Sequence, residues 1–454
     1  MGKLEGNFTS ALKAFIICQP ILDILTYFSM EYWNLPLTIG IAIRILFMGY
    51  SLLYIFWEKE SRWKKQVIFY LGILFAVLGF SFLLNYFTKP DFILFDEIQY
   101  YVKNLYFPVL ISALLLAQAD RDRKTGVKLY ELIPSAMFIL SLSLFLAVLT
   151  GTSNRTYQFQ EGYLGWFFAG NEISAILAIC FPVVLYSFKN EQNHRKRSFF
   201  LLCLFMMMAA ALLIGTKVSY FSILLTLIIA VFGTIIQKVF LEKKIPVKKT
   251  AVLFLAMIVS YIAATPFTPS YNNLGGFFQR LSIEKQFADS EKEVLEEPSA
   301  EHEQESDLPD QEASNGFLSV ILSKRNIHWQ NLLEDYKDAG IIHQLFGLGY
   351  AGFYEGEPKL AEMDFFDIFI SFGIVGFLIM LLPFFVIVKD LLKFLFRQPK
   401  RFFHPEHINL LISLFLGLGI AFFAGHVLYA PAVSIYLAMV FVLLLHYYSL
   451  PHEN

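Results

Sequence analysis

Twelve apolar stretches, each long enough to cross a lipid bilayer, follow one another along this chain and constrain its fold more than any other feature. A spanning helix needs about 20 mostly apolar residues, because it crosses a hydrocarbon core about 30 Å thick. The predicted spans are 11–28, 36–56, 66–86, 98–118, 130–149, 165–188, 198–214, 217–237, 250–266, 364–388, 407–427 and 430–449. Only 16% of the residues are charged, where a soluble domain carries about a quarter. The sequence therefore predicts an all-α, polytopic membrane protein of about 12 transmembrane helices.

The first apolar run, 11–29, follows two lysines but shows no small-residue cleavage pattern. We interpret it as a retained helix with a kink at Pro20, not as a removed signal peptide. The three cysteines, Cys18, Cys180 and Cys203, all lie inside apolar runs and share no CxxC spacing. We expect them to be buried as small hydrophobic residues, without a disulfide or a metal site.

The distribution of lysine and arginine predicts an orientation. Six alternate connecting segments carry 24 of the 36 basic residues: 1–13, 58–65, 119–128, 189–197, 238–249 and 389–404. The other short connections carry only Lys89, Arg155 and Lys217. Because basic residues accumulate in cytoplasmic loops, we expect the first set of segments and both termini to lie in the cytoplasm.

One connection, 267–362, is long, and this orientation places it outside the cytoplasm. It separates nine predicted transmembrane helices in 1–266 from three more in 363–454. The middle of the loop, 284–312, is rich in acidic and poor in apolar residues, so we predict that it is disordered. Apolar residues in 317–337 recur at helical spacing, which predicts an amphipathic helix.

Ionisable side chains in the predicted spans share one depth. Asp23, Arg44, Lys103 and Glu172 lie in the outer halves of their spans. Four more lie at outer ends: Lys217, Asp364, Asp367 and His426. Such groups are costly inside a bilayer and mark functional sites by default, so the pattern favours a polar cavity open to the outside. The alternative is that Asp23 with Arg44, or Glu172 with Lys103, forms a buried pair that only fixes helix packing.

Several catalytic motifs are absent from the sequence, which contains no GxxxxGK[ST], no HExxH and no GxSxG. ATPase, zinc-protease and serine-hydrolase activities therefore have no support. Glu362 and Asp364 have the spacing of a carboxylate pair that holds a divalent cation for a nucleotide sugar. They are expected outside the cytoplasm, where nucleotide sugars are scarce. We expect no metal, no cofactor and no nucleic-acid partner.

The second half of the long loop carries residues suited to an anionic, sugar-bearing ligand. Arg325, His328 and Trp329 share one face of the predicted helix. Arginine can hold phosphate oxygens in a bidentate fork, and tryptophan can stack on a sugar. With Lys217 and Arg44 they predict a cationic site for a pyrophosphate. A helix whose basic face lies on lipid headgroups would show a similar pattern.

Five short motifs follow in order along the chain, at 170–172 (GNE), 213–217 (LIGTK), 324–329 (KRNIHW), 345–350 (LFGLGY) and 364–376 (DFFDIFISFGIVG). They resemble the N-x-x-(small), T-G-S-R, R-x-x-x-W, P-L-F-G-x-G and (H/D)-N-x-x-L-x-x-x-x-G-x-x-G elements of the O-antigen ligase and Wzy-type polymerase family of membrane glycosyltransferases. The resemblance covers about 165–440, and the first five spans match only in topology.

The resemblance implies a GT-C-like glycosyltransferase of the bacterial cell (inner) membrane that needs no metal. Such an enzyme moves a glycan from an undecaprenyl pyrophosphate donor to an acceptor hydroxyl on the outer face of that membrane, and its partners would include a flippase and a chain-length regulator. Carried over by motif, Lys217 and Arg325 hold the donor pyrophosphate. Arg44 and Lys103 match no family motif, but their positions in the spans predict that they add positive charge to this site. Three further residues are candidates for contacts with the sugar or the acceptor: Trp329, Glu172 and His426.

The chain departs from the family pattern in two places. Lys217 stands where the family has arginine, which keeps the charge but loses the fork. A histidine implicated in the ligases is missing near the start of the span after the loop, where this chain has Glu362, Met363 and Asp364. This difference favours a repeat-unit polymerase over a lipid A-core ligase. Asp364 or Glu362 is then the predicted catalytic base, and the alternative for Asp364 is that it only caps its helix. His328 and His426 are further candidates for the base, and the alternative for each is a structural histidine.

Two other classes of protein stay open as alternatives. A lipid-linked oligosaccharide flippase needs pseudo-symmetric halves and usually a site at the membrane midplane. The sequence shows no inverted repeat, and its polar groups lie high in the spans. A structural or sensor protein would tolerate the loss of Arg325 and Lys217.

Overall fold

The computed structural model describes residues 2–33, 38–58, 61–119, 129–155, 161–240, 247–296, 325–353 and 358–449. In its first half the helices are α1 (Gly2–Ile17), α2 (Gln19–Glu31), α3 (Ile39–Trp57), α4 (Lys64–Thr88), α5 (Leu94–Ala119), α6 (Leu129–Leu149), α7 (Gly170–Asn190), α8 (His194–Ile214) and α9 (Lys217–Phe240). In the second half they are α10 (Val247–Ala264), the 3₁₀ turn η2 (Thr265–Phe267), α11 (Pro269–Glu296), α13 (Arg325–Asp338), α14 (Ile341–Phe346), α15 (Asp364–Met380), α16 (Leu382–Arg397), α17 (Pro399–Phe402), α18 (Pro405–Phe423) and α19 (Pro431–Ser449). A small antiparallel sheet pairs β1 (Asn154–Arg155) with β2 (Tyr163–Gly165).

Eleven of the described helices are long and apolar enough to cross a membrane, and the bent pair α1–α2 makes a twelfth span if it is counted as one. This confirms the predicted all-α, multi-pass membrane fold. The bend between α1 and α2 measures 60° and follows Cys18. Pro20 lies in the first turn of α2, where its missing N–H costs no helical hydrogen bond. The kink predicted at Pro20 lies within two residues of this bend.

The spans α5, α7 and α19 are the most buried, with about four-fifths of their residues inside the protein. α7 is apolar along 173–185, and these residues are all buried by neighbouring helices. Gly417 of α18 allows a close approach here. A Cβ at Gly417 would lie 2.8 Å from Leu437 of α19 and 3.2 Å from Ile179 of α7. The core of the bundle therefore depends on small residues between helices.

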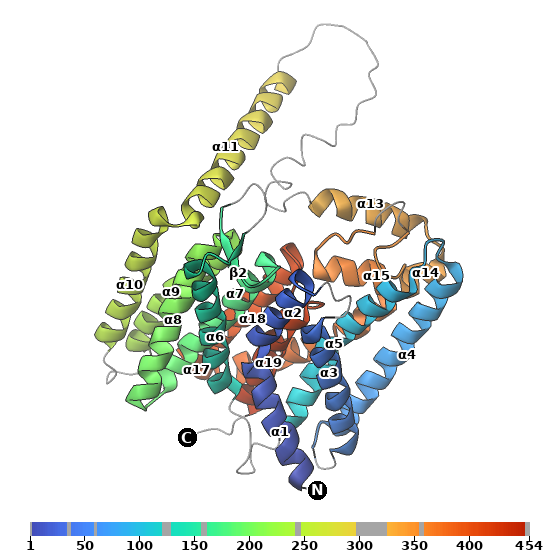
Figure 1. Cartoon of the computed structure of the whole chain (residues 1–454), viewed down its shortest axis with the longest axis horizontal. Helices are drawn as coiled ribbons and strands as arrows, with labels where there is room; N and C mark the ends of the chain where they lie inside the picture. Colours follow the sequence, from blue (N-terminus) through green and yellow to red (C-terminus); the bar gives the residue numbers. More distant parts are fainter. Residues whose placement is uncertain are drawn as a thin grey trace.

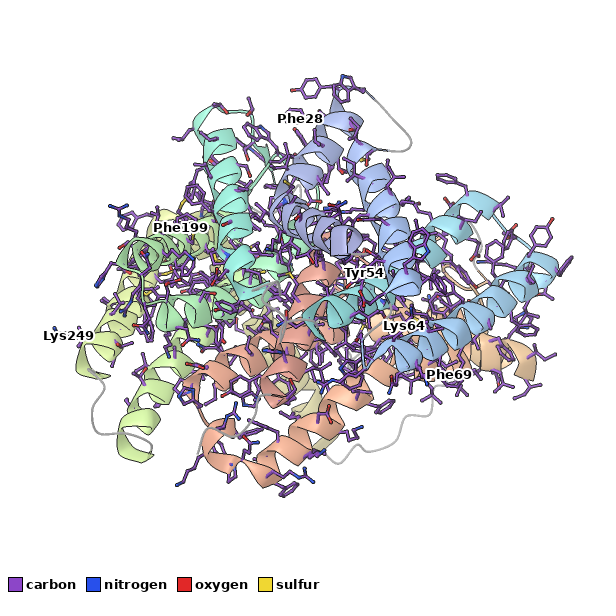
Figure 2. The ribbon with its side chains drawn as sticks, turned by 90° about the horizontal axis from the view of Figure 1, so that it is seen from below. Phe28, Tyr54, Lys64, Phe69, Phe199 and Lys249 are labelled. Carbon is purple, nitrogen blue, oxygen red and sulfur yellow. The ribbon has the colours of Figure 1, made fainter. Side chains whose placement is uncertain are left out.

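The outer helices present apolar side chains to the surroundings. Phe69 of α4 and Val259 of α10 are 71% and 59% exposed. Figure 2 shows such side chains standing out from the perimeter of the bundle, with Phe69 on the outer side of α4. In a membrane these surfaces face lipid, so their exposure needs no protein partner.

The predicted span 364–388 is not one regular helix. Gly373 interrupts α15 with φ +66° and ψ −175°. The turn after α14 fits into this break, where Leu348 N–H donates to the Ile370 carbonyl at 3.0 Å and Gly349 N–H donates to the Ser371 carbonyl at 3.1 Å. A Cβ at Gly373 would lie 2.5 Å from the Leu345 carbonyl. The apolar run predicted a continuous helix because hydropathy does not register a backbone that must admit another segment.

A buried ion pair between the end of α4 and the start of α5 holds the same turn in place. Lys89 Nζ lies 2.6 Å from Glu97 Oε1, and both side chains are 1% exposed. Glu97 also accepts a hydrogen bond from Tyr350 N–H at 2.9 Å, and Lys89 donates to the Tyr350 carbonyl at 2.5 Å. Asn85 donates to the Gly347 carbonyl at 3.2 Å. We call Lys89, Glu97 and Tyr350 the clamp.

Outside the spans, α11 and α13 lie on one side of the bundle, opposite the side where α1 begins (Figure 1). α11 continues to Glu296 and so extends into the segment 284–312, which we predicted to be disordered. The reason for the difference is local: 284–296 contains four Glu and two Lys, which favour helix even where no core forms. Residues 297–312 of that segment lie outside the described residues.

The predicted amphipathic helix 317–337 corresponds to α13 from Arg325 onward, and 317–324 lies outside the described residues. The described apolar residues of this helix pack on the protein. Leu332 and Tyr336 are buried against Leu348, Ala361 and Ile370. The helix therefore packs on the segment around α14 and α15, which fixes the position of its first residue.

Candidate active site

The turn between α8 and α9 positions Lys217. Gly215 has φ +75°, a left-handed conformation that glycine adopts without strain. Its carbonyl accepts a hydrogen bond from Asn273 Nδ2 of α11 at 3.0 Å. Lys217 opens α9, and its Nζ lies 4.1 Å from the centre of the Phe277 ring, also on α11. The ammonium is thus held over an aromatic face at the junction of α9 and α11.

Arg325 is the first residue of α13, and its side chain is only 14% exposed. One guanidinium nitrogen, Nη2, donates to Glu362 Oε2 at 3.1 Å. Within the described residues, its Nε is buried and has no hydrogen-bond partner. The charge of Arg325 also acts on Lys217. A buried guanidinium donor without an acceptor is costly and suits an incoming anion.

Glu362 and His426 face each other from two loops. His426 Nε2 lies 3.8 Å from Glu362 Oε2, which is also the oxygen that contacts Arg325. Both residues have φ +60°, and the third non-glycine residue with positive φ among those described is Ala351. Such backbone conformations cost about 1–3 kcal/mol each and persist only where the surroundings enforce them. The strain is therefore concentrated on the two members of one charged contact.

Two buried carboxylates hold these loops in place. Asp364 Oδ2 accepts hydrogen bonds from the N–H groups of Val427, at 2.8 Å, and Leu428, at 2.6 Å. Asp367 accepts hydrogen bonds from the N–H groups of Ala361, at 2.9 Å, and Met363, at 3.0 Å. Asp364 and Asp367 are 0% and 1% exposed. Asp364 thus lies in the first turn of α15 but bonds to the loop that carries His426, which is the geometry of an anchor for that loop.

The charged contact shifts the pKa of both partners. The close contact with His426, together with the charges of His426 and Arg325, lowers the pKa of Glu362 to about 2 despite its partial burial. Burial lowers the pKa of His426, but the contact with Glu362 and the charges of Glu172 and Asp364 outweigh burial and raise it above the ordinary value of 6.5. Glu362 is thus ionised at neutral pH, and His426 holds its proton more tightly than a free histidine.

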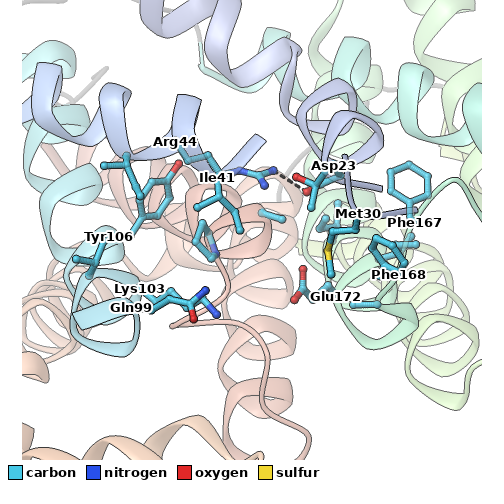
Figure 3. Close-up of a pocket in the computed structure, with 18 of the residues that line it drawn as sticks. Asp23, Met30, Ile41, Arg44, Gln99, Lys103, Tyr106, Phe167, Phe168 and Glu172 are labelled. Carbon is cyan, nitrogen blue, oxygen red and sulfur yellow. Dashed lines mark hydrogen bonds and ion pairs between the residues drawn. The ribbon is translucent and has the colours of Figure 1, made fainter. Parts of the chain in front are cut away.

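A cavity of about 370 Å³ lies between α2, α3, α5, α6, α7 and α19. Arg44 lines it and is already paired, because its Nη2 lies 2.7 Å from Asp23 Oδ1 and its Nε donates to Gln19 Oε1 at 3.1 Å. Lys103 and Glu172 also line it. Figure 3 shows the ends of these two side chains turned toward the centre from opposite walls. Within the part of the chain that the structure describes, no ion pair within 4 Å joins them.

The predicted site residues thus fall into two neighbouring groups. Arg44, Lys103 and Glu172 line the cavity, whereas Arg325, Glu362, His426 and Lys217 are not part of its lining. The charges of Glu172 and His426 act on each other, so the two groups adjoin. We call the residues Arg325, Lys217, Glu362 and His426 the charged cluster.

Two predicted residues lie at the edge of the charged cluster. The Trp329 ring is 4.3 Å from the ring of Phe366 and packs against the apolar residues beneath α13. Burial and the charge of Lys359 lower the pKa of His328, against the attraction of Glu362, so its imidazole is neutral at pH 7. The structure brings His328 near Glu362 but leaves it out of the ion pairs.

Sequence reasoning did not single out two further residues of the cavity. Gln99 and Tyr106 line it together with Lys103. The three occupy positions i, i+4 and i+7 of α5 and therefore share one face of that helix. Their spacing around a lysine within an apolar span was the available signal. Among the described residues no group of three or more His, Cys, Asp or Glu side chains is placed to hold a metal ion.

The fold and the charged cluster define a class: a multi-pass, all-α membrane protein with ionisable side chains gathered in a cavity and in an adjoining pair of loops. A family model described as "O-antigen ligase like membrane protein" matches residues 5–449. The chain belongs to this family. No curated protein matches the chain. Membership of the family makes the chain a glycosyl-transferring membrane protein, a glycan ligase or polymerase in general terms.

Proposed function

We propose that the protein is a metal-independent glycosyltransferase that moves a glycan from undecaprenyl pyrophosphate to an acceptor hydroxyl. We propose further that the acceptor is another lipid-linked repeat unit, so that the enzyme polymerises a polysaccharide. The observation that carries this proposal is the partly buried Arg325, which lies beside the Glu362–His426 contact and within electrostatic reach of Lys217. Its Nε has no hydrogen-bond partner among the described residues.

The cationic part of the charged cluster is suited to a diphosphate. Arg325 supplies a planar fork whose Nε donor meets no acceptor in the described part of the chain, and Lys217 supplies a second positive charge. Glu362 compensates Arg325 while no anion is bound. As the sugar leaves, negative charge grows on the pyrophosphate oxygens, and fixed cations at that point stabilise the transition state.

The Glu362–His426 contact is suited to proton transfer from the acceptor. The acceptor oxygen bonds to the anomeric carbon, the bond from that carbon to the phosphate oxygen breaks, and its electron pair leaves with the pyrophosphate. The hydroxyl proton passes to the neutral imidazole of His426, and the ionised Glu362 stabilises the imidazolium. Attack opposite the leaving group inverts the anomeric centre. In this scheme Asp364 anchors the loop that carries His426.

We propose that the charged cluster lies on the outer side of a bacterial inner membrane and that both termini are cytoplasmic. The excess of lysine and arginine in the alternate segments supports this orientation. The arrangement in Figure 1 agrees with it, since α13 lies opposite the start of α1.

The test replaces Arg325 with alanine in the full-length protein, reconstituted in proteoliposomes with an undecaprenyl-pyrophosphate-linked repeat unit. We expect R325A to lose the polymer ladder, at least 100-fold in rate, because the departing pyrophosphate loses its buried donor. Lys337→Ala is the matched control, since it removes an exposed charge from the same helix. A wild-type ladder from folded R325A would refute the proposal. A single transfer to a different acceptor, without a ladder, would identify a ligase.

A further inference from the structure

The cavity beside the charged cluster has a composition unlike that of an anion site. Its four ionisable groups are two acids, Asp23 and Glu172, and two bases, Arg44 and Lys103, so their formal charges cancel. Arg44 is already committed to Asp23 and Gln19. A diphosphate entering this cavity would gain no net Coulomb attraction. The cavity is therefore a different site from the one formed by Arg325 and Lys217.

The polar groups left without partners are those that bind hydroxyls. Tyr106 is only 2% exposed, and its buried hydroxyl has no hydrogen-bond partner among the described residues. Lys103 and Gln99 follow on the same face of α5, and the Glu172 carboxylate points in from α7 (Figure 3). One ammonium, one amide, one phenol and one carboxylate offer both donors and acceptors. A buried, unpaired phenol beside three partly exposed polar side chains favours a polar occupant.

The remaining walls are aromatic and aliphatic. Phe167 and Phe168, which follow β2, line the cavity together with Ile41 and Ile176. A volume of about 370 Å³ is within the range of roughly 300–1,000 Å³ of small-molecule sites. A few convergent polar groups set among rings suit a compact ligand with many hydroxyls and apolar C–H faces.

We propose that this cavity binds an uncharged sugar residue of the acceptor glycan, next to the hydroxyl that reacts. The inference rests on the proposed function and assigns it an acceptor site. Glu172 and Lys103 hold the hydroxyls of the bound sugar, Tyr106 donates to a third oxygen, and Phe167 or Phe168 covers its apolar face. The mutual electrostatic influence of Glu172 and His426 places the cavity beside the proposed base.

The test measures two ligands on the full-length protein in phosphatidylglycerol nanodiscs. Saturation-transfer NMR reports a panel of free monosaccharides (glucose, galactose, mannose, N-acetylglucosamine and N-acetylgalactosamine), and a separate titration reports undecaprenyl diphosphate. We expect a sugar signal from the wild type that falls at least five-fold in Glu172→Gln and in Lys103→Met. We expect the affinity of these two variants for undecaprenyl diphosphate to stay within two-fold of wild type. Arg325→Ala should show the opposite pattern.

A third variant is needed in case Glu172→Gln or Lys103→Met lowers the sugar signal only by misfolding. Ile98 lines the cavity and is 45% exposed, so Ile98→Trp fills its mouth and leaves every polar group in place. It should also remove the sugar signal, and Lys337→Ala should not. If the wild type does not bind undecaprenyl diphosphate, the proposed function is contradicted. If the wild type binds undecaprenyl diphosphate but gives no sugar signal, only this inference is overturned.

Two other outcomes would overturn the acceptor site. One is a sugar signal that survives in Glu172→Gln, Lys103→Met and Ile98→Trp. The other is that the cavity binds the headgroup of a zwitterionic lipid, whose two charges also cancel. If the wild type retains phosphatidylethanolamine over phosphatidylglycerol in native mass spectra, and Glu172→Gln abolishes that preference without changing the sugar signal, the cavity holds a lipid headgroup instead.

Discussion

The Glu362–His426 contact combines backbone strain with a pair of displaced pKa values. Both residues keep φ +60° because Asp364 and Asp367 bind the N–H groups of the loops on either side. The strain and the buried carboxylates therefore serve one geometry, in which an imidazole meets an ionised carboxylate beside Arg325. Sites where a protein stores strain in this way are commonly functional, because stability alone would select against it.

A pH profile tests the role of this contact. If neutral His426 accepts the proton, the transfer rate rises with pH through the pKa of His426, which Glu362 holds above 6.5. Glu362→Gln removes that stabilisation of the imidazolium, so the midpoint should move to lower pH while the maximal rate falls roughly 10-fold or more. Rates measured between pH 5 and 9 in proteoliposomes would show this. An unchanged midpoint in the variant would exclude the pairing from the mechanism.

The contribution of the same contact to folding stability depends on pH. The pKa of His426 is raised, so its contribution to folding is complete below the unfolded value near 6.5 and is lost as pH rises through the folded pKa. The pKa of Glu362 is lowered to about 2, so its contribution is present above the ordinary value of 4.5 and is lost as pH falls toward 2. Both contributions to stability are therefore complete between about pH 4.5 and pH 6.5.

At the scale of elements, the break in α15 determines where α13 and the charged cluster lie. A regular helix would have no room for the turn after α14, whose backbone bonds to Ile370 and Ser371. The turn in turn contributes Leu348 to the apolar cluster that receives α13. Gly373 thus acts on the site through packing, at a distance from the chemistry.

Gly373→Ala should destabilise the protein. The new Cβ would lie 2.5 Å from the Leu345 carbonyl, and the combination of φ +66° with ψ −175° is one that essentially only glycine adopts. We expect a melting temperature several degrees below that of the wild type, measured by intrinsic fluorescence in detergent. The matched control is Gly419→Ala on α18, where nothing lies within 4 Å of the new Cβ. Equal melting temperatures for the two variants would contradict this account of the break.

For the whole molecule, the clamp joins parts of the chain that are far apart in sequence. Tyr350 and Glu97 are separated by 253 residues, and their hydrogen bond connects the start of α5 to the turn after α14, which fits into the break of α15. A charged pair at 1% exposure adds little net stability, because desolvation offsets attraction. Its main effect is to exclude other placements of the turn, since an unpaired charge there would be costly.

A double-mutant comparison tests the clamp. Lys89→Met leaves Glu97 charged and buried without its partner, which should cost about 3–5 kcal/mol of folding free energy. Adding Glu97→Gln removes that charge and keeps an acceptor for Tyr350 N–H, so the double variant should be more stable than K89M alone. Denaturant titration of the purified variants measures both. Additive losses would show that the two side chains do not act as a pair.

The sequence by itself determined the membrane class and the positions of most spans. Hydropathy and the placement of lysine and arginine are local or cumulative properties, so no tertiary information was needed. The motif order also pointed to the family that the match over 5–449 confirms. Only the tertiary structure decided that Arg44 is occupied by Asp23, that Glu362 meets His426, and that Gly373 breaks α15. These features depend on residues from distant segments meeting in space, and the pattern along one span carries no record of its partners.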